Sequence, residues 1–222
     1  LYLAGFSDYA VYQWVAMPFF AEYVVQWRYH GEARRALTQD AQYAAIPTGP
    51  RGKIKTLVGV VSEERLVHKA ARGKYGQRAD FLLLGKPNGN WGLFSFHDFG
   101  LDNVVAVLRH AEMLKRGRVP GGLSFPLLQK DGEVPEVRGI YYHRDGNQIF
   151  NGSPTHPDVR PTQLTFNEIW ELVQIALNDE QRTAYWNTKT MSLEDRMFNA
   201  RNAITLVEEF MVEEMEKLLV KE

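Results

Sequence analysis

The sequence predicts an α+β protein with a small central mixed β-sheet, flanked by helices and extended by helical segments at both ends. Two observations carry this prediction. Two short apolar segments, 81–84 and 91–96, are joined by the turn-forming residues 87–90, which is typical of paired strands. Residues 101–116, and the chain from 165 onwards, instead repeat apolar side chains at helical spacing.

The composition limits the classes of protein to which the chain can belong. With 222 residues, of which 45% are hydrophobic, the chain can bury a substantial core and is not disordered by composition. The net charge of -1 gives no bulk electrostatic argument for nucleic acid or membrane. The absence of cysteine excludes disulfides and thiolate chemistry. It fits an intracellular, cytoplasmic protein.

We expect three segments along the chain. Residues 1–45 form an aromatic, helical N-terminal segment, 46–162 an α/β core, and 163–222 a helical C-terminal segment packed on the same domain. No secretory signal is visible. The apolar start of the chain is interrupted by Asp8, Gln13 and Glu22, so we expect no membrane span.

The N-terminal segment holds ten aromatic side chains in its first thirty residues. A helix capped by Ser7 or Asp8 should run to about Gln26, and Pro18 should kink or divide it. Apolar groups fall on most of its sides, so the helix should be buried or pack against a partner. We expect an aromatic core, with a surface that stacks on a ligand as the alternative.

The next segments mix loop, strand and helix signals. Residues 46–53 resemble a phosphate-binding loop in passing, but they lack its glycine and hydroxyl positions, so we expect an ordinary loop. A strand is expected over 56–61, followed by a helix over 62–72. Residues 51–78 carry eight basic and two acidic side chains, a local excess of six. This excess indicates either a solvated face or a surface for a phosphate backbone.

Beyond the central hairpin, 101–116 should form a helix, and 124–129 and 137–142 two further strands. Residues 144–162 should form a loop. Thr165 begins a helix, because Glu168 three residues later completes a capping box.

The last predicted helix begins at Ser192 with Asp195. Its apolar residues alternate between spacings of four and three, close to a heptad seam: Leu193, Met197, Ala200, Ile204, Val207, Met211, Met215 and Leu218. Two interpretations follow. The helix packs on its own domain, or it forms a homodimer through this seam.

Residues 57–116 present a helix with Glu63 and Glu64, a strand that begins at Asp80, a strand that ends at Ser95-Phe96-His97, and another helix. This order resembles the PD-(D/E)xK nuclease superfamily, in which an acid on the first helix, an Asp entering a strand and a Glu-x-Lys on the next strand surround magnesium. Phosphodiester hydrolysis uses carboxylates to hold a hard Mg²⁺ and activate water.

The resemblance implies a catalytic site of Asp80, His97, Asp98 and Glu64, with Asp80 and Asp98 as Mg²⁺ ligands. It implies DNA or RNA as partner, with phosphates held by basic residues of the preceding segment: Lys69, Arg72, Lys74 and Arg78. The chain departs from the pattern, because Ser95 and His97 stand where the superfamily has Glu and Lys. His97 could act as base or ligand, and Asp98 could supply the missing carboxylate.

Two other hypotheses remain open at this stage. The chain could be a catalytically inactive interaction or assembly protein that keeps the fold and binds through its aromatic N-terminal or acidic C-terminal helix. It could also be an α+β protein unrelated to the nucleases. The convergence of Glu64, Asp80, His97 and Asp98 in space would separate the hypotheses.

Overall fold

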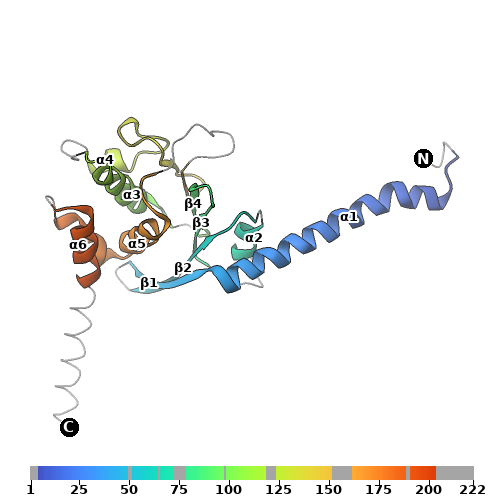
Figure 1. Ribbon diagram of the computed structural model, residues 1–222, viewed down its shortest axis with the longest axis horizontal. Helices are drawn as coiled ribbons and strands as arrows, with labels where there is room; N and C mark the ends of the chain where they lie inside the picture. The colour runs from blue at the N-terminus through green and yellow to red at the C-terminus, as the bar shows by residue number, and fades with distance from the viewer. Residues whose placement is uncertain are drawn as a thin grey trace, which may run out of the picture.

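The computed structural model describes residues 5–49, 52–64, 66–72, 79–97, 99–118, 124–151, 162–188 and 191–203. Within these ranges, a six-stranded sheet carries helices on both faces, and one long helix, α1 (Asp8–Arg35), extends far from the body (Figure 1). The predicted α+β class, with helices at both ends of the chain, is confirmed.

The sheet has the strand order β1-β2-β3-β4-β6-β5. Its strands are β1 (Gln42–Thr48), β2 (Lys53–Val61), β3 (Phe81–Gly85), β4 (Trp91–Ser95), β5 (Tyr141–His143) and β6 (Gln148–Asn151). β2 and β3 are parallel and every other neighbouring pair is antiparallel, so the sheet is mixed, as predicted.

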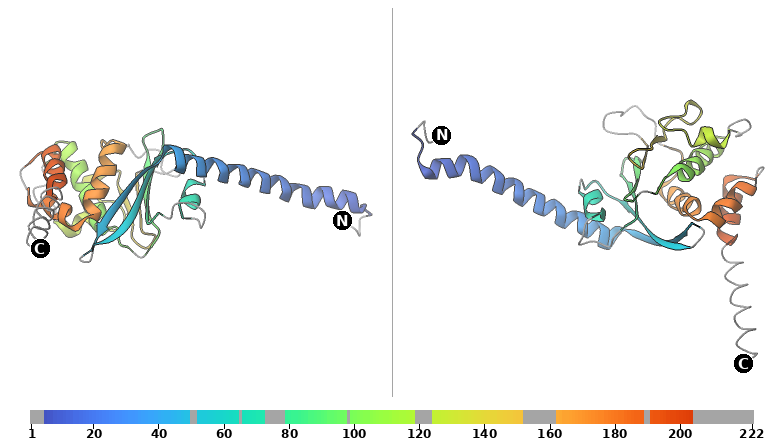
Figure 2. Two further views of the ribbon diagram at one scale, coloured as in Figure 1. Left: turned by 90° about the horizontal axis from the view of Figure 1, so that it is seen from below. Right: turned by 180° about the vertical axis from the view of Figure 1, so that it is seen from behind.

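The helices of the body are arranged around this sheet (Figure 2). They are α2 (Val67–Arg72), α3 (Asp102–Lys115), α4 (Phe125–Leu128), α5 (Phe166–Leu177) and α6 (Asp179–Asn187). A π-helical turn, η2 (Ala36–Asp40), follows α1, a 3₁₀ turn, η3 (Pro135–Val137), precedes β5, and residues 193–203 are also helical. The capping box of Thr165 and Glu168 at the start of α5 is present as predicted.

Each face of the sheet has its own apolar core, because successive side chains of a strand point to opposite faces. Leu57 and Phe81 pack with α3 and α5 in the larger core, whereas Val58 and Leu82 pack with α2 and the end of α1 in the smaller one. The two groups of helices lie on opposite sides of the strands in Figure 1. The sheet therefore joins the base of α1 to the main body.

Two predicted boundaries before the hairpin are wrong. The expected loop at 46–53 begins inside β1, which pairs with β2 and turns at Gly49 and Gly52, both with positive φ. The expected helix from Ser62 begins only at Val67. The reason is that the Ser62 N–H donates to the carbonyl of Gly85, which continues the sheet past β2 instead of starting a helix.

The expected strand at 124–129 is wrong: these residues include the short helix α4. Residues 137–142 are a 3₁₀ end followed by the start of β5, and the expected loop from 144 contains β6. A buried arginine explains why residues 124–129 and the start of 137–142 are not strands. The Arg109 guanidinium of α3 donates to four backbone carbonyls, which fixes this segment around α3: those of Leu128, Lys130, Gly132 and Ile140.

The N-terminal segment differs most from expectation. α1 does not end near Gln26 but continues to Arg35, and Pro18 lies inside it without dividing it. The expected aromatic core is wrong, because most large side chains of α1 are exposed. Only its last turns are anchored, through Tyr29 and Ala33 in the smaller core.

The C-terminal helix begins after Ser192, as predicted. Leu193, Met197 and Ala200, the first three positions of the predicted seam, are buried in the larger core beside α5 and α6. These three residues therefore pack on their own domain. The seam positions from Ile204 onwards lie outside the described residues.

Candidate functional site

The Asp80 carboxylate lies at the entrance of β3 and is met by three groups from neighbouring segments. Its Oδ1 accepts a hydrogen bond from the Lys55 ammonium at 2.9 Å, and its Oδ2 accepts one from the Thr56 N–H at 2.8 Å. The Nε2 of His97 lies 3.2 Å from Oδ1. The cluster is partly open to solvent, since the side chain of Asp80 is 19% exposed.

The register of the sheet explains why these residues meet. In the parallel pair, Leu57 of β2 is opposite Phe81 of β3, so Thr56 and Lys55 lie beside Asp80. In the antiparallel pair, Phe81 is opposite Ser95, so His97 emerges from β4 next to the same carboxylate. Backbone hydrogen bonds from Asp80 N to Thr56 O and from Phe96 N to Asp80 O close the arrangement.

The electrostatics keep this carboxylate ionised. Partial burial opposes ionisation, but the hydrogen bonds from the Thr56 N–H and Lys55, together with the charges of Lys55 and His97, hold the pKa of Asp80 below its ordinary value of 3.8. At neutral pH Asp80 is therefore an anion that Lys55 already neutralises. Such a group can hold a neighbouring imidazole in place or accept hydrogen bonds from a bound molecule.

The sequence-predicted site residues are only partly brought together. Asp80 and His97 are in contact, whereas Glu64 lies beside α1, where burial and the charge of Glu32 raise the pKa of Glu64. Asp98 lies outside the described residues, and so do Lys74 and Arg78.

The two described members of the predicted phosphate-binding set lie on α2. Lys69 and Arg72 are exposed there, one and four residues after His68 in the sequence. Burial, with the charges of Arg72 and Lys69, lowers the pKa of His68, whose ring packs edge-on against Phe94 at 4.6 Å between centroids. No described contact joins these two cations to Asp80.

The described residues around Asp80 do not fit the Mg²⁺ site that the resemblance implies. Magnesium in proteins is held by several oxygen ligands, usually including more than one carboxylate or a substrate phosphate. Among the residues that the structure describes, no three His, Cys, Asp or Glu side chains are grouped so that they could hold a metal ion. Lys55 occupies the side of the carboxylate where a cation would be expected.

Lys55 is the member of this cluster that sequence reasoning missed. It belongs to the basic stretch 51–78, but nothing in the local pattern distinguishes it from the seven other basic residues there. Its role depends on the parallel pairing of β2 with β3, a long-range feature. The Lys55 ammonium reaches Asp80 from β2, and not from the segment Ser95-Phe96-His97 where the resemblance predicted a Glu-x-Lys motif.

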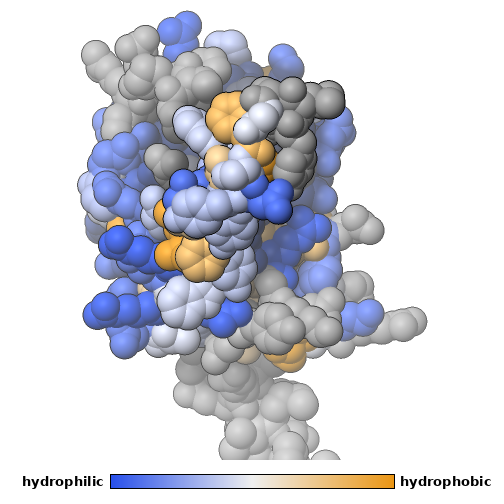
Figure 3. Space-filling model, turned by 90° about the vertical axis from the view of Figure 1, so that its right-hand side faces the viewer, coloured by the Kyte–Doolittle hydropathy of each residue, from blue (hydrophilic) through white to orange (hydrophobic). Residues whose placement is uncertain are grey.

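A second notable feature is the exposed surface of α1. Figure 3 looks along this helix from its free end and shows apolar and weakly polar side chains gathered on it, in front of a more hydrophilic body. Seven aromatic side chains between residues 9 and 27 are exposed. Exposed apolar surface of this extent usually marks an interaction site.

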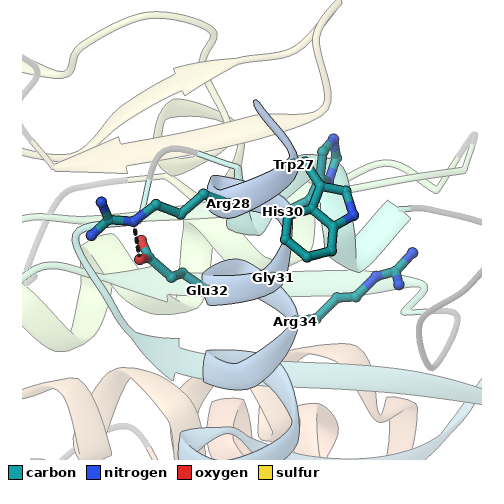
Figure 4. Close-up of a pocket in the computed structure, with 6 residues that line it drawn as sticks. All are labelled: Trp27, Arg28, His30, Gly31, Glu32 and Arg34. Atoms are coloured by element: carbon teal, nitrogen blue, oxygen red, sulfur yellow. Dashed lines mark hydrogen bonds and ion pairs between the residues drawn. The ribbon is translucent and has the colours of Figure 1, made fainter. Parts of the chain in front are cut away.

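Where α1 approaches the body, its surface borders an open hollow of about 640 Å³. All its described lining residues come from one helix: Trp27, Arg28, His30, Gly31, Glu32 and Arg34. In Figure 4, Arg28 and Glu32 lie on one side of the helix, joined by an ion pair of 2.8 Å, and Trp27 and Arg34 lie on the other. The hollow therefore belongs to the surface of α1 and does not enclose a ligand.

No protein-family model, no curated protein and no solved structure matches this chain. Function must therefore be argued from the geometry of Asp80 and α1. Among the helices that the structure describes, none has both the length and the apolarity that crossing a membrane requires.

Proposed function

We propose that this chain is an interaction or assembly protein that docks on a partner polypeptide through α1. The observation that supports the proposal is the exposure of the large apolar side chains of α1, from Tyr9 to Trp27. A helix that is apolar on most sides is normally buried. Burial of apolar surface is the largest favourable contribution to protein association, and the exposed aromatic side chains of α1 have this contribution still to gain.

The base of α1 is built to hold the helix in place. Tyr29, Ala33, Ala36 and Leu37 pack in the smaller core against strand residues such as Val58. The helix is continuous from this anchor to Asp8, a length of about 40 Å. A rigid projection of this kind presents its side chains to a partner at little cost in conformational entropy.

The docking role predicts an apolar surface on α1 that a small probe can detect. In dilute solution the wild-type chain should bind the dye bis-ANS. The variant with both Phe20→Ser and Tyr23→Ser should lower the dye fluorescence to less than about a third, because it removes two rings from the exposed patch.

The matched control is the variant with Val15→Ser and Val25→Ser, which changes two exposed aliphatic residues of the same helix. It should keep most of the dye signal, and circular dichroism should show equal helix content in both variants. Equal fluorescence from the wild-type chain and the aromatic variant would overturn the docking role.

A second candidate function rests on the contact of Asp80 with Lys55 and His97. We propose, as the alternative, that this cluster acts on nucleic acid by phosphodiester hydrolysis. An anionic carboxylate beside an imidazole is an arrangement that can accept a proton from an attacking water. The supporting observation is the presence of both partners within 3.2 Å of one carboxylate oxygen.

This alternative predicts that Asp80→Asn lowers the rate of nucleic-acid cleavage by at least about 100-fold. The rate is measured on supercoiled plasmid DNA and on single-stranded RNA, once with Mg²⁺ and once with a chelator. The variant should also lose about 1–3 kcal/mol of unfolding free energy, because charge-assisted hydrogen bonds are removed. Its folded fraction therefore has to be checked first. The control is Asp145→Asn in the exposed turn before β6. Wild-type cleavage rates in Asp80→Asn, or no cleavage by the wild-type chain, would exclude the alternative.

A further inference from the structure

The exposed aromatic side chains of α1 are not spread evenly around the helix. With about 100° of rotation per residue, six of them fall within an arc of about 100°. We call this set the aromatic face: Tyr9, Tyr12, Phe19, Phe20, Tyr23 and Trp27. Each of its side chains is between 56% and 73% exposed. Ala16 lies within the same arc, whereas Trp14 and Glu22 lie outside it.

The charges of α1 are placed away from this face. Between Tyr9 and Trp27 the only charged residue is Glu22, which points to another side. The other charged residues lie at the two ends of the helix. Asp8 lies in the first turn, and the C-terminal turns carry Arg28 and Glu32, which form an ion pair, followed by Arg34 and Arg35.

The area of the aromatic face matches what a stable pair of chains requires. An aromatic side chain contributes about 150–250 Å² of contact area, so six rings at their observed exposure present roughly 800 Å². Two such faces would bury about 1,600 Å², which is the usual size of a specific protein interface. The patch exceeds the 300–600 Å² of the largest apolar patch on a typical monomer.

We propose that the aromatic face binds the aromatic face of a second copy of this chain, with the two α1 helices antiparallel. The inference rests on the proposed docking role of α1 and adds the identity of the partner. An antiparallel pair centred on Pro18 places Tyr9 opposite Trp27 and the small Ala16 opposite the large Phe20.

The shape of the chain favours this orientation over a parallel pair. The body lies at the C-terminal end of α1 and the other end is free (Figure 1). Antiparallel helices therefore keep the two bodies at opposite ends of the pair, and the face ends at Trp27, just before the anchored residues begin.

The first test is the mass of the full chain in solution, measured by light scattering over a range of concentrations. The wild-type chain should approach twice the 25.5 kDa of a single chain. The Phe20→Ser/Tyr23→Ser variant should remain at the mass of one chain at concentrations where the Val15→Ser/Val25→Ser control is paired. A wild-type chain that stays single at all concentrations overturns the inference, and the docking role survives if that chain still binds bis-ANS.

The second test is the orientation of the pair. The chain has no cysteine, so Ala21→Cys and Val25→Cys each provide a unique spin-label position, exposed and outside the aromatic face. In the antiparallel pair, the two labels are displaced along the axis by about 9 Å at residue 21 and about 21 Å at residue 25. A parallel pair has no displacement along the axis, so it would give the same distance between labels at both positions. That result, or a mass above that of two chains, would overturn the antiparallel pair while leaving α1 as the docking helix.

Discussion

At the scale of single residues, Asp80 shows how far sequence reasoning reaches. Its position at the start of a strand, and the nearness of His97, could be predicted from the order of strands and turns. Lys55 could not, because it reaches Asp80 only through the parallel pairing of β2 with β3. The predicted place of Glu64 in the site also fails to appear, since the chain after β2 turns toward α1 before α2 begins.

His110 gives the clearest pH dependence at this scale. Its Nδ1 lies 2.9 Å from the Tyr185 hydroxyl, and its ring packs against Trp186 inside the main body. Burial, helped by the charge of Arg196, lowers the pKa of His110 from 6.5 to about 4. The folded chain therefore keeps this imidazole neutral at a pH where the unfolded chain protonates it.

We predict that the unfolding free energy falls by about 3 kcal/mol as the pH decreases from 6.5 to 4, because the unfolded state binds the extra proton. Urea unfolding at several pH values across this range measures the slope of the unfolding free energy against pH. His110→Gln, which keeps a hydrogen-bonding group near Tyr185, should flatten it, and the exposed His30→Gln should not. If His110→Gln shows the same pH dependence of unfolding free energy as the wild-type chain, groups other than His110 cause it. The stability contributed by Asp80 is lost at lower pH, below its ordinary value of 3.8.

At the scale of elements, local signals predicted the structure where local chemistry decides it. The hairpin of β3 and β4 follows from its turn residues, with Gly89 at positive φ, and α5 follows from the capping box of Thr165. The segment around α4 was predicted as strand because its apolar run fits either state. The conformation of this segment depends on Arg109, which lies 15 or more residues earlier in the chain and donates hydrogen bonds to backbone carbonyls of the segment.

Gly59 in the middle of β2 shows another feature that only packing explains. A Cβ atom at this position would lie 2.6 Å from the ring of Trp170 on α5. The helix approaches the strand closely because residue 59 has no side chain. The sequence predicted both elements, but it gave no indication that they touch at this point.

At the scale of the whole molecule, the chain combines a packed α/β body with a helix that leaves it. The burial of Leu164 to Ala200 in one core with the sheet shows that the described C-terminal helices belong to the body. The sequence pattern placed the aromatic residues of α1 in a core because their composition is that of buried residues. In the structure these side chains are exposed, and in the proposed pair a second molecule would cover them.

The aromatic face itself could have been predicted from the sequence. The spacing of Tyr9, Tyr12, Phe19, Tyr23 and Trp27 could have been recognised as a single side of a helix. The predicted interruption at Pro18 concealed it, because a divided helix has no common face. Continuity of α1 through Pro18 is therefore the structural fact on which the proposed pairing depends.

The most direct test of this account is hydroxyl-radical labelling of the rings of α1, read by mass spectrometry at low and high concentration of the full chain. Trp14 is exposed on the same helix but outside the aromatic face, so it serves as an internal control. We predict that labelling of Phe20, Tyr23 and Trp27 falls by about fivefold or more at high concentration, because the paired face excludes solvent, while Trp14 is labelled as before. Labelling of these rings that does not change with concentration would contradict the account.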